Sequence, residues 1–295
     1  MKVLVFGSLN IDFIYQLEHV VAQNETILSS ASKVSPGGKG LNQAMAFAKT
    51  GLPVYIASNL GNNGDVLQHA LIEGGVHTEL LNKVDSDSGE AIIQVDKNGN
   101  NAIIVCPNCN QEISDVYVDE VFTHFENGDI LVIQNEINNL SRIIHQAKAQ
   151  GMQIVFNPSP FNETILTLPM ENIDYLFINE VEGAQLTGSK DEDVIVDTVL
   201  KRYPNTHLIL TLGERGAVYA DNNQRVHQPA KRVEVVDTVG AGDTFTGFFI
   251  YGITHGKNVA ESLAMATAAS SIVITRPGAG NSIPTLNEVM TALAE

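Results

Sequence analysis

Residues 236–245 read Val-Asp-Thr-Val-Gly-Ala-Gly-Asp-Thr-Phe and indicate a glycine-rich loop that opens a helix. Gly240 and Gly242 bracket one alanine, so the backbone there can turn tightly and approach a ligand. From Phe245 onward, apolar residues recur at roughly helical spacing. The start of a helix presents unpaired N–H groups and the positive end of the helix dipole. The stretch therefore predicts an anion site.

Asp243 lies at the rim of this predicted anion site. A carboxylate beside a phosphate group is unfavourable unless it accepts a proton or holds a cation. We interpret Asp243 as the base that takes the proton of a hydroxyl group while the loop amides hold the transferred phosphoryl group. The alternative is an acidic N-cap at the start of a helix.

The composition describes an ordinary globular chain of 295 residues, 44% hydrophobic and 17% charged. Its formal net charge of -17 disfavours binding to nucleic acids and to anionic membranes. No apolar run is long enough to cross a bilayer, and the first residues do not resemble a secretory signal, so we expect a cytoplasmic protein. Cys106 and Cys109 fit a reducing compartment, and one CxxC pair supplies only two of the four ligands of a structural zinc site.

Continuous apolar runs alternate with segments of helical pattern along most of the chain. The runs, typical of buried parallel strands, are residues 3–6, 54–57, 130–133, 153–156, 175–178 and 208–211. The expected helices are residues 41–49, 65–73, 140–149 and 193–203. This alternation predicts an α/β doubly wound sheet, in which ligands bind beyond the carboxyl ends of the strands.

Two stretches interrupt the alternation. Residues 89–105 contain an Asn-Gly turn between two β-rich runs, which predicts a hairpin. Within 12–33, residues 13–15 and 27–29 also have the composition of strands. We expect a small sheet, either a lid or a subunit interface, formed by approximately residues 12–34 and 89–106 of a single domain spanning 1–295. The alternative is two surface hairpins without a function.

Residues 36–44 form a second glycine-rich loop that opens a helix, Pro-Gly-Gly-Lys-Gly-Leu-Asn-Gln-Ala. It is not a Walker A loop, because no Ser or Thr follows the lysine and the glycine spacing is wrong. Its glycines would let a polyol lie against the backbone, with Lys39 and Asn42 as donors. Asn10 and Asp12 would point the same way from an extended chain and grip adjacent hydroxyls. Alternatively, the last two belong to a polar turn.

Three further stretches have the composition of nucleotide or cation sites. Asn179 and Glu182 share one side of a first helical turn, which suits water-mediated Mg²⁺ binding or, alternatively, helix capping. The glycine-rich turn 211–216 is typical of a nucleotide contact but also of ordinary turns. The carbonyl groups of 276–282, with the Asp237 carboxylate, could bind a monovalent cation.

Together these stretches resemble the ribokinase-like (PfkB) sugar kinases over residues 7–284. The two signature regions are 37–44 and 237–245, and both occur in the expected order. The resemblance implies a three-layer α/β/α sheet with a β lid that often forms a homodimer contact. It also implies an enzyme that transfers the γ-phosphoryl group of ATP to a primary hydroxyl, with Mg²⁺ and a monovalent cation such as K⁺.

The resemblance also implies roles for individual residues. Asp243 would be the base, and the anion hole would comprise Gly240, Ala241 and Gly242. The sugar would be held by Asn10, Asp12, Gly38, Lys39, Asn42 and Glu136. ATP would contact Asn179, Thr211, Leu212, Gly213, Glu214, Arg215, Gly216, Gly242 and, near the adenine, Thr267. Glu182 would help to position Mg²⁺, and the monovalent cation would be surrounded by Asp237, Val239, Val273, Arg276, Gly278 and Ser282.

The sequence departs from the family pattern at two places near the predicted lid. Residues 22–26 read Ala-Gln-Asn-Glu-Thr where Pro-Gly-Glu-Thr is usual, and 106–110 read Cys-Pro-Asn-Cys-Asn where a Gly-Ala-Asn-like segment is common. The expected acceptor is the 5-hydroxyl of ribose, and the alternatives are another furanose, a nucleoside, a sugar phosphate or a non-catalytic sugar sensor. The sequence leaves open the sugar, the oligomeric state, the monovalent cation and any role of the two cysteines.

Overall fold

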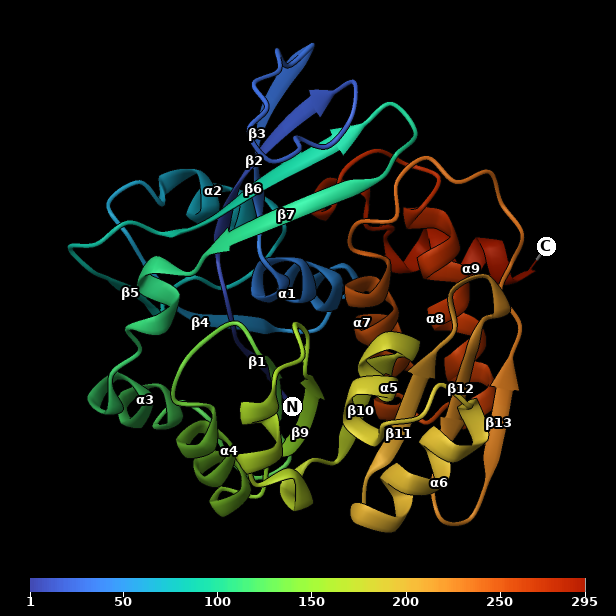
Figure 1. Ribbon diagram of the computed structural model, residues 1–295. Coiled ribbons are helices and arrows are strands. Elements are labelled where there is room, and N and C mark those ends of the chain that lie inside the picture. Colours follow the sequence, from blue (N-terminus) through green and yellow to red (C-terminus); the bar gives the residue numbers. More distant parts are fainter. Residues whose placement is uncertain (295) are drawn as a thin grey trace.

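A computed structural model describes residues 1–294 and contains a large, mostly parallel sheet (Figure 1). In spatial order its strands are β13-β12-β11-β10-β9-β8-β1-β4-β5, and only β12 runs antiparallel to its neighbours. The strands are β1 (Val3–Phe6), β4 (Val54–Leu60), β5 (Leu81–Lys83), β8 (Ile130–Gln134), β9 (Gln153–Asn157), β10 (Tyr175–Asn179), β11 (His207–Thr211), β12 (Ala217–Ala220) and β13 (Arg225–Gln228). Each of the six apolar runs lies in one of these strands.

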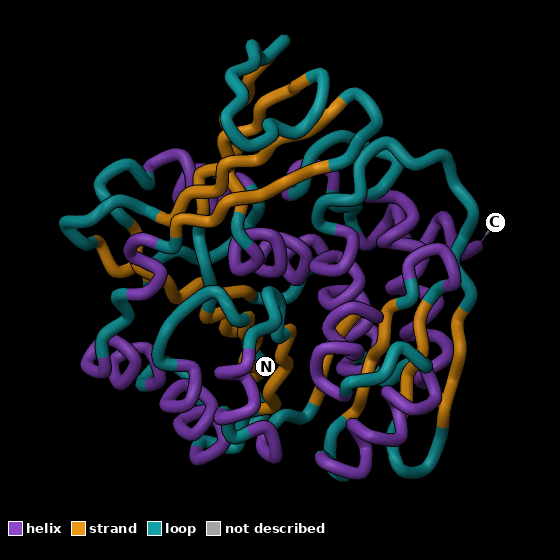
Figure 2. Tube along the Cα trace, in the orientation of Figure 1, coloured by secondary structure: helices purple, strands orange, loops and turns teal. Residues whose placement is uncertain are grey.

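Helices cover both faces of this sheet, which confirms the α/β doubly wound architecture (Figure 2). One face packs against α1 (Lys39–Lys49), α2 (Asp65–Glu73), α7 (Ala241–Thr254), α8 (Val259–Val273) and α9 (Leu286–Ala294). The other face packs against α3 (Asp115–Phe122), α4 (Leu140–Ala149), α5 (Glu180–Thr187) and α6 (Glu192–Arg202). Strand β1 shows the reason for its continuous apolar pattern: Val3 and Val5 enter the first core, and Leu4 and Phe6 enter the second.

The strand order reverses between β1 and β8. From β1 the chain continues outward through β4 and β5, and it then crosses to the opposite side to build β8, β9, β10 and β11. In such sheets ligands bind in the crevice beyond the carboxyl ends of the strands at the reversal. Ser8 follows β1 and Glu136 follows β8, so the topology brings these two residues together.

A second, four-stranded sheet lies at the top of Figure 1, on the side opposite α4 and α6. Its strands, in spatial order, are β3 (Ala31–Gly37), β2 (Asn10–Leu17), β6 (Gly89–Asp96) and β7 (Asn101–Cys106). The predicted hairpin at 89–105 is present as β6 and β7. The expected strand at 27–29 was wrong. Strand β3 begins at Ala31, which pairs with Gln16, and Leu28 lies before the paired region with 93% of its surface exposed.

Helices α1 and α7 pack side by side, and a glycine sets their separation. A Cβ atom at Gly247 would lie 3.0 Å from the Cβ of Ala46 and from its carbonyl carbon. One turn nearer the start of each helix, Gln43 of α1 contacts Asp243 of α7. Both helices therefore begin at the same end of the molecule, and the two glycine-rich motifs meet there. Among the described residues, no helix has the length and apolar character needed to cross a membrane.

Candidate active site

Helix α7 begins at the glycine-rich loop that the sequence singled out. Gly240 is the N-cap residue in the left-handed region (φ 77°), where its lack of a Cβ atom matters. Asp243 is the third helical residue and not the N-cap, so the capping alternative for this carboxylate was wrong. Within residues 1–294, the backbone N–H groups of Gly242 and Asp243 have no acceptor. These free amides, at the positive end of the helix dipole, form an anion site.

Asp243 is buried, with 7% of its surface exposed, and one of its carboxylate oxygens is fixed by a neighbour. Gln43 donates a hydrogen bond from Nε2 to Oδ1 of Asp243 at 2.9 Å. The carboxylate also lines a cavity of about 300 Å³, so it is neither sealed in the core nor free in solvent. A carboxylate at a cavity wall beside unpaired amides can accept a proton from a bound hydroxyl.

This cavity brings together residues from both glycine-rich motifs and from the strand ends. It is lined by Lys39, Asn157, Ser159, Phe177, Ile178, Asn179, Glu182, Thr211, Thr238, Gly240, Ala241, Gly242, Asp243 and Thr246. Eight of the predicted site residues are therefore in one place, and the remaining predicted residues lie outside this lining.

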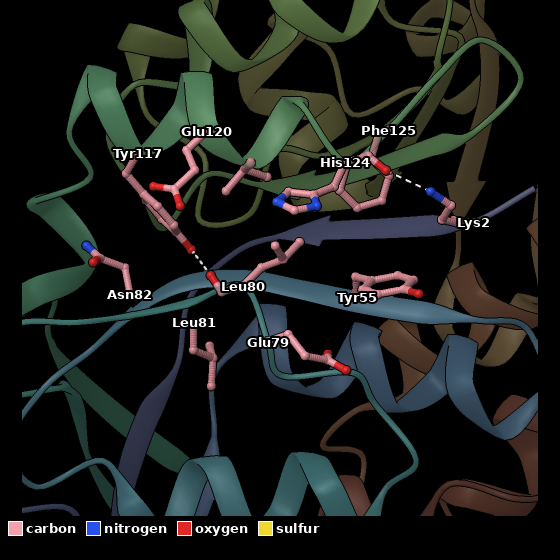
Figure 3. A pocket seen from close by; sticks show the side chains of 11 residues that line it. Lys2, Tyr55, Glu79, Leu80, Leu81, Asn82, Tyr117, Glu120, His124 and Phe125 are labelled. Carbon is pink, nitrogen blue, oxygen red and sulfur yellow. Dashed lines mark hydrogen bonds between the residues drawn. The ribbon is translucent and has the colours of Figure 1, made fainter.

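A larger cavity of about 490 Å³ lies elsewhere, between β4 and α3 (Figure 3). Its wall includes Tyr55, Tyr117 and Phe125, and the Tyr117 hydroxyl donates to the carbonyl oxygen of Leu80. None of the predicted site residues lines it. We therefore assign the chemistry to the smaller cavity.

Lys39 is the first residue of α1 and lines the same cavity as Asp243. Burial disfavours its charge, but the carboxylates of Asp243, Glu136 and Glu182 outweigh this effect and raise the pKa of the Lys39 ammonium group. The preceding Gly38 adopts φ 93°, and a Cβ atom there would lie 2.9 Å from the backbone nitrogen of Asn10. The loop thus needs a glycine both for its conformation and for its close packing against β2.

Asn10 and Asp12 lie two residues apart at the start of β2, beside this loop, so their side chains point to the same side of the strand, as we predicted. Asn10 is buried, and its Oδ1 accepts a hydrogen bond from Nδ2 of Asn110 at 2.8 Å. Glu136 accepts hydrogen bonds from the Ser8 hydroxyl and, at 3.2 Å, from the backbone N–H of Lys39. This carboxylate therefore joins the β1 and β8 ends to the start of α1.

Asp12 carries an unusual carboxyl group. Burial, and secondly the neighbouring Glu136 carboxylate, raise the pKa of Asp12 to about 7. Gly37 makes room for this group, because a Cβ atom at position 37 would lie 2.1 Å from Oδ2 of Asp12. The site therefore holds two acidic side chains close together at a place where hydroxyl donors of a ligand would stabilise them.

Asn179 and Glu182 form a capping box at the start of α5, which was one of the two alternatives for this pair. The Asn179 side chain accepts from the Glu182 N–H at 2.9 Å, and the Glu182 carboxylate accepts from the Asn179 N–H at 3.0 Å. Both residues also line the cavity, so capping holds the Glu182 carboxylate at its wall. In the predicted nucleotide turn 211–216, which follows β11, Arg215 forms ion pairs with Glu180 and Glu192 on the surface.

The predicted cation residues lie at the end of α8, which includes Val273, and in two adjoining loops that are joined by Asp237. Its carboxylate accepts from the N–H of Val239 at 3.0 Å and from the N–H of Gly278 at 2.9 Å. Arg276 extends toward the Ser282 carbonyl oxygen and pairs with Glu288. The Val273 carbonyl oxygen accepts from the backbone N–H of Arg276. Each carbonyl oxygen keeps a second lone pair, so these bonds leave acceptors for a cation.

Two predicted residues carry buried polar atoms that lack a hydrogen-bond partner within residues 1–294. They are Oδ1 of Asn42, in the first turn of α1, and Oγ1 of Thr267, in α8. Buried polar atoms are normally paired, so each unpaired one calls for an explanation. For Asn42 and Thr267, which belong to the predicted sugar and adenine contacts, a bound ligand would supply the partner.

Sequence reasoning missed three side chains that build the site, namely Gln43, Gln134 and Asn110. Gln43 donates a hydrogen bond to Asp243, and Gln134 donates one to Gln43. Asn110 donates one to Asn10. The sequence offered one indication of these residues: each polar residue either follows an apolar run or interrupts a buried helix face. It identifies a buried polar group but does not reveal its partner.

Cys109 is buried, and burial, followed by the nearby Glu112 carboxylate, raises the pKa of its thiol to about 11. A thiol that keeps its proton at neutral pH is a poor nucleophile and metal ligand. Cys106 and Cys109 are both free thiols in this structure.

Comparison with known proteins shows the family and the fold of the chain. A model of the pfkB family of carbohydrate kinases matches residues 1–286. Ribokinase from Lactococcus lactis is 32% identical over 300 residues, covering 100% of this chain and 97% of that relative. Deoxyribokinase from Salmonella typhimurium is 29% identical over 303 residues, covering 98% of this chain and 97% of that relative.

The solved structure of Arabidopsis thaliana ribokinase complexed with ribose and ATP superimposes with a TM-score of 0.87 at 27% identity, covering 100% of this chain and 99% of that one. The expected family and three-layer fold are thus confirmed. The chain belongs to the pfkB family of carbohydrate kinases, and it is a phosphotransferase whose acceptor is an alcohol group.

Proposed function

We propose that this enzyme transfers the γ-phosphoryl group of ATP to a primary hydroxyl of a sugar, with the 5-hydroxyl of D-ribose as the favoured acceptor. One observation carries the proposal: the Asp243 carboxylate and the free amides of α7 share a cavity with Lys39 from the second glycine-rich loop. The relatives named ribokinase support ribose as the sugar.

In the proposed reaction, the acceptor oxygen forms a bond to the γ-phosphorus as the bond from that phosphorus to the leaving oxygen of ADP breaks. Asp243 receives the proton of the hydroxyl. The amides of Gly242 and Asp243 hold the phosphoryl oxygens, and Lys39 lies close enough to offset their charge. Because such transition states are loose, positioning and charge stabilisation contribute most of the rate.

For Mg²⁺, the chain offers few direct ligands. No group of three or more His, Cys, Asp or Glu side chains suited to a metal ion occurs within residues 1–294. Mg²⁺ retains most of its waters and binds largely through nucleotide phosphates, so one carboxylate besides the proposed base Asp243 is enough at the cavity wall. Glu182 occupies that position and would hold the hydrated ion, which would neutralise phosphate charge.

The loops joined by Asp237 would hold a monovalent cation, for which we favour K⁺. Carbonyl oxygens of Val239, Val273, Arg276 and Gly278, with Ser282, would surround it. Because the loop containing Val239 leads directly into the anion site, an ion there would order the amides of α7. Replacing K⁺ by tetramethylammonium in the assay should then lower kcat, and equal rates would exclude this role.

The second sheet is proposed to act as a lid on the sugar and as the contact of a homodimer. It carries exposed apolar side chains on β3 and on the edge strand β7, at Val34, Ile103, Ile104 and Val105. Exposed apolar side chains on strands with a free edge favour burial against a second copy. Sedimentation equilibrium would detect the dimer, and a monomer at micromolar concentration would exclude it. The free thiols and the use of ATP support a cytoplasmic location.

The identity of the acceptor can be tested by measuring ADP release with ribose, deoxyribose, fructose, nucleosides and sugar phosphates. We expect the highest kcat/KM with ribose. A preference for another acceptor would replace ribose but keep the reaction, as the similarity to deoxyribokinase illustrates. Tight ribose binding without ADP release from any acceptor would instead favour the sugar sensor.

Asp12→Asn should raise KM for the sugar by about 10- to 100-fold, because a hydrogen bond to a charged group contributes about 1.5–3 kcal/mol. The same change should stabilise the protein without sugar. The folded chain keeps the Asp12 proton up to a pH of about 7, whereas the unfolded chain loses it near the ordinary value of 3.8. Between these values the folded state binds more protons, so the free energy of unfolding falls as pH rises.

The measurements are sugar titrations and thermal unfolding at several pH values. The Tm advantage of the D12N variant over the wild type should grow from about pH 4 to about pH 8 and then stay constant. The exposed carboxylate of Asp85 provides a matched control, and Asp85→Asn should show no such trend. A pH-independent difference for D12N would contradict the raised pKa.

A further inference from the structure

We infer that Gln43 is a positioning residue that holds and orients the Asp243 carboxylate, and that Gln134 in turn holds Gln43. Three buried side chains form a chain of hydrogen bonds. Nε2 of Gln134 donates to Oε1 of Gln43 at 2.7 Å, and Nε2 of Gln43 donates to Oδ1 of Asp243 at 2.9 Å. At most 1% of either glutamine is exposed.

The chemistry of the three groups fixes the direction of this chain. A carboxylate oxygen accepts hydrogen bonds, so Gln43 must turn its NH₂ group toward Asp243. Its own oxygen then faces Gln134, which must also present an NH₂ group. Because Gln134 turns its NH₂ group toward Gln43, its Oε1 points the other way. This oxygen is buried and has no hydrogen-bond partner within residues 1–294. The orphaned oxygen is the cost of orienting the other two groups.

The backbone around the chain leaves little room for another arrangement. Oε1 of Gln134 packs against Gly7, where a Cβ atom would lie 2.2 Å away. On the other side, the close approach of Gly247 to Ala46 presses α7 against α1 one turn beyond the Gln43 contact. The three side chains therefore have one well-packed arrangement, which pins Oδ1 of Asp243.

With Oδ1 held by Gln43, Oδ2 of Asp243 is the oxygen left to receive the proton of the acceptor hydroxyl. Gln43 does not line the cavity, so it acts on the reaction only through Asp243. This inference rests on the proposed role of Asp243 as the base. It adds two residues that decide whether that base points at its substrate.

The test uses Gln43→Met, which keeps similar length but removes the donor, and Gln134→Met, which leaves Gln43 without its anchor. We expect kcat to fall by about 10- to 100-fold for Q43M, the size of effect that a misplaced catalytic group produces. Q134M should show a smaller loss. KM for ATP and for the acceptor should stay within about threefold, because neither glutamine lines the cavity.

Gln150→Met is the matched control. Gln150 likewise donates one side-chain hydrogen bond, to the Phe122 carbonyl oxygen at 2.9 Å, and its Oε1 is also unpaired, but it lies at the end of α4. It should change the unfolding midpoint at most and leave kcat unchanged. If Q43M proves too unstable to assay, Q134M, which does not touch Asp243, carries the same test.

A double-mutant cycle separates positioning from general damage. In an Asp243→Asn background, Q43M should cause no further loss of kcat, because the group that it orients has already been removed. Multiplying losses, or a wild-type kcat for both Q43M and Q134M, would overturn the inference. If D243N itself retained wild-type turnover, the proposed base would be wrong, which is a different outcome from a failure of Gln43.

Discussion

Replacement of Asp243 by asparagine should lower kcat by about 10²–10⁴, the usual contribution of a general base. Asparagine has the same shape and keeps an oxygen that can accept the hydrogen bond from Gln43, so the fold should persist. The amide cannot take the proton of the acceptor hydroxyl. KM for ATP and for the sugar should therefore change by no more than a few-fold, while turnover falls.

Asp129→Asn is the matched control, because it removes another buried carboxylate. Asp129 accepts backbone hydrogen bonds from Lys2 and Glu126 far from the cavity. Its loss should lower the unfolding midpoint and spare kcat. ADP release measured by a coupled assay, together with calorimetric titration of the sugar, distinguishes the two variants. A turnover of D243N within a few-fold of wild type would remove Asp243 from the mechanism.

Gly242→Ala should also lower kcat/KM strongly, by about 10²–10³, because the added methyl group would keep the phosphoryl group from reaching an amide donor, and the loss of one such contact has an effect of this size. A Cβ atom at this position would meet no protein atom within 4 Å, and the residue lines the cavity. The added methyl group would therefore enter the space where the phosphoryl group is expected to face the amides. Within the helix itself the change is favourable, since alanine exceeds glycine in helix propensity by about 1 kcal/mol.

The unfolding midpoint serves as an internal control for this variant. We expect kcat/KM to fall while the unfolding midpoint stays the same or rises. A general loss of stability would instead lower both. If G242A instead kept full activity, the phosphoryl group would have to bind away from the start of α7. A lowered midpoint would show that the methyl group meets protein atoms after all.

Much of the fold was predictable because single segments determine it. Strand β1 is apolar at every position since both of its faces are buried, and the Asn-Gly turn fixed the β6–β7 hairpin. Strand β3 was not found, because its sequence Ala-Ser-Lys-Val-Ser-Pro-Gly has little apolar character and its pairing is provided by β2. The apolar residues at 27 and 28 misled the prediction because Leu28 is exposed.

The site divides in the same way. Asn10 and Asp12 could be paired from sequence because they are two residues apart on one strand. Gln43 and Asp243 are separated by 200 positions, and only the packing of α1 on α7 brings them together. The sequence could not choose between capping and metal binding for Glu182 either, since the same carboxylate caps α5 and faces the cavity.

The contact between Gly247 and Ala46 has a consequence for the reaction coordinate. The start of α1 is the proposed cradle of the acceptor, and the start of α7 that of the phosphoryl donor. The gap that the transferring group must cross is therefore governed by how closely two backbones approach about a turn away. A side chain at position 247 would push the neighbouring helix by a few tenths of an ångström. The distance between the bound acceptor and the phosphoryl donor thus depends on a glycine at position 247, although this residue would touch neither reactant.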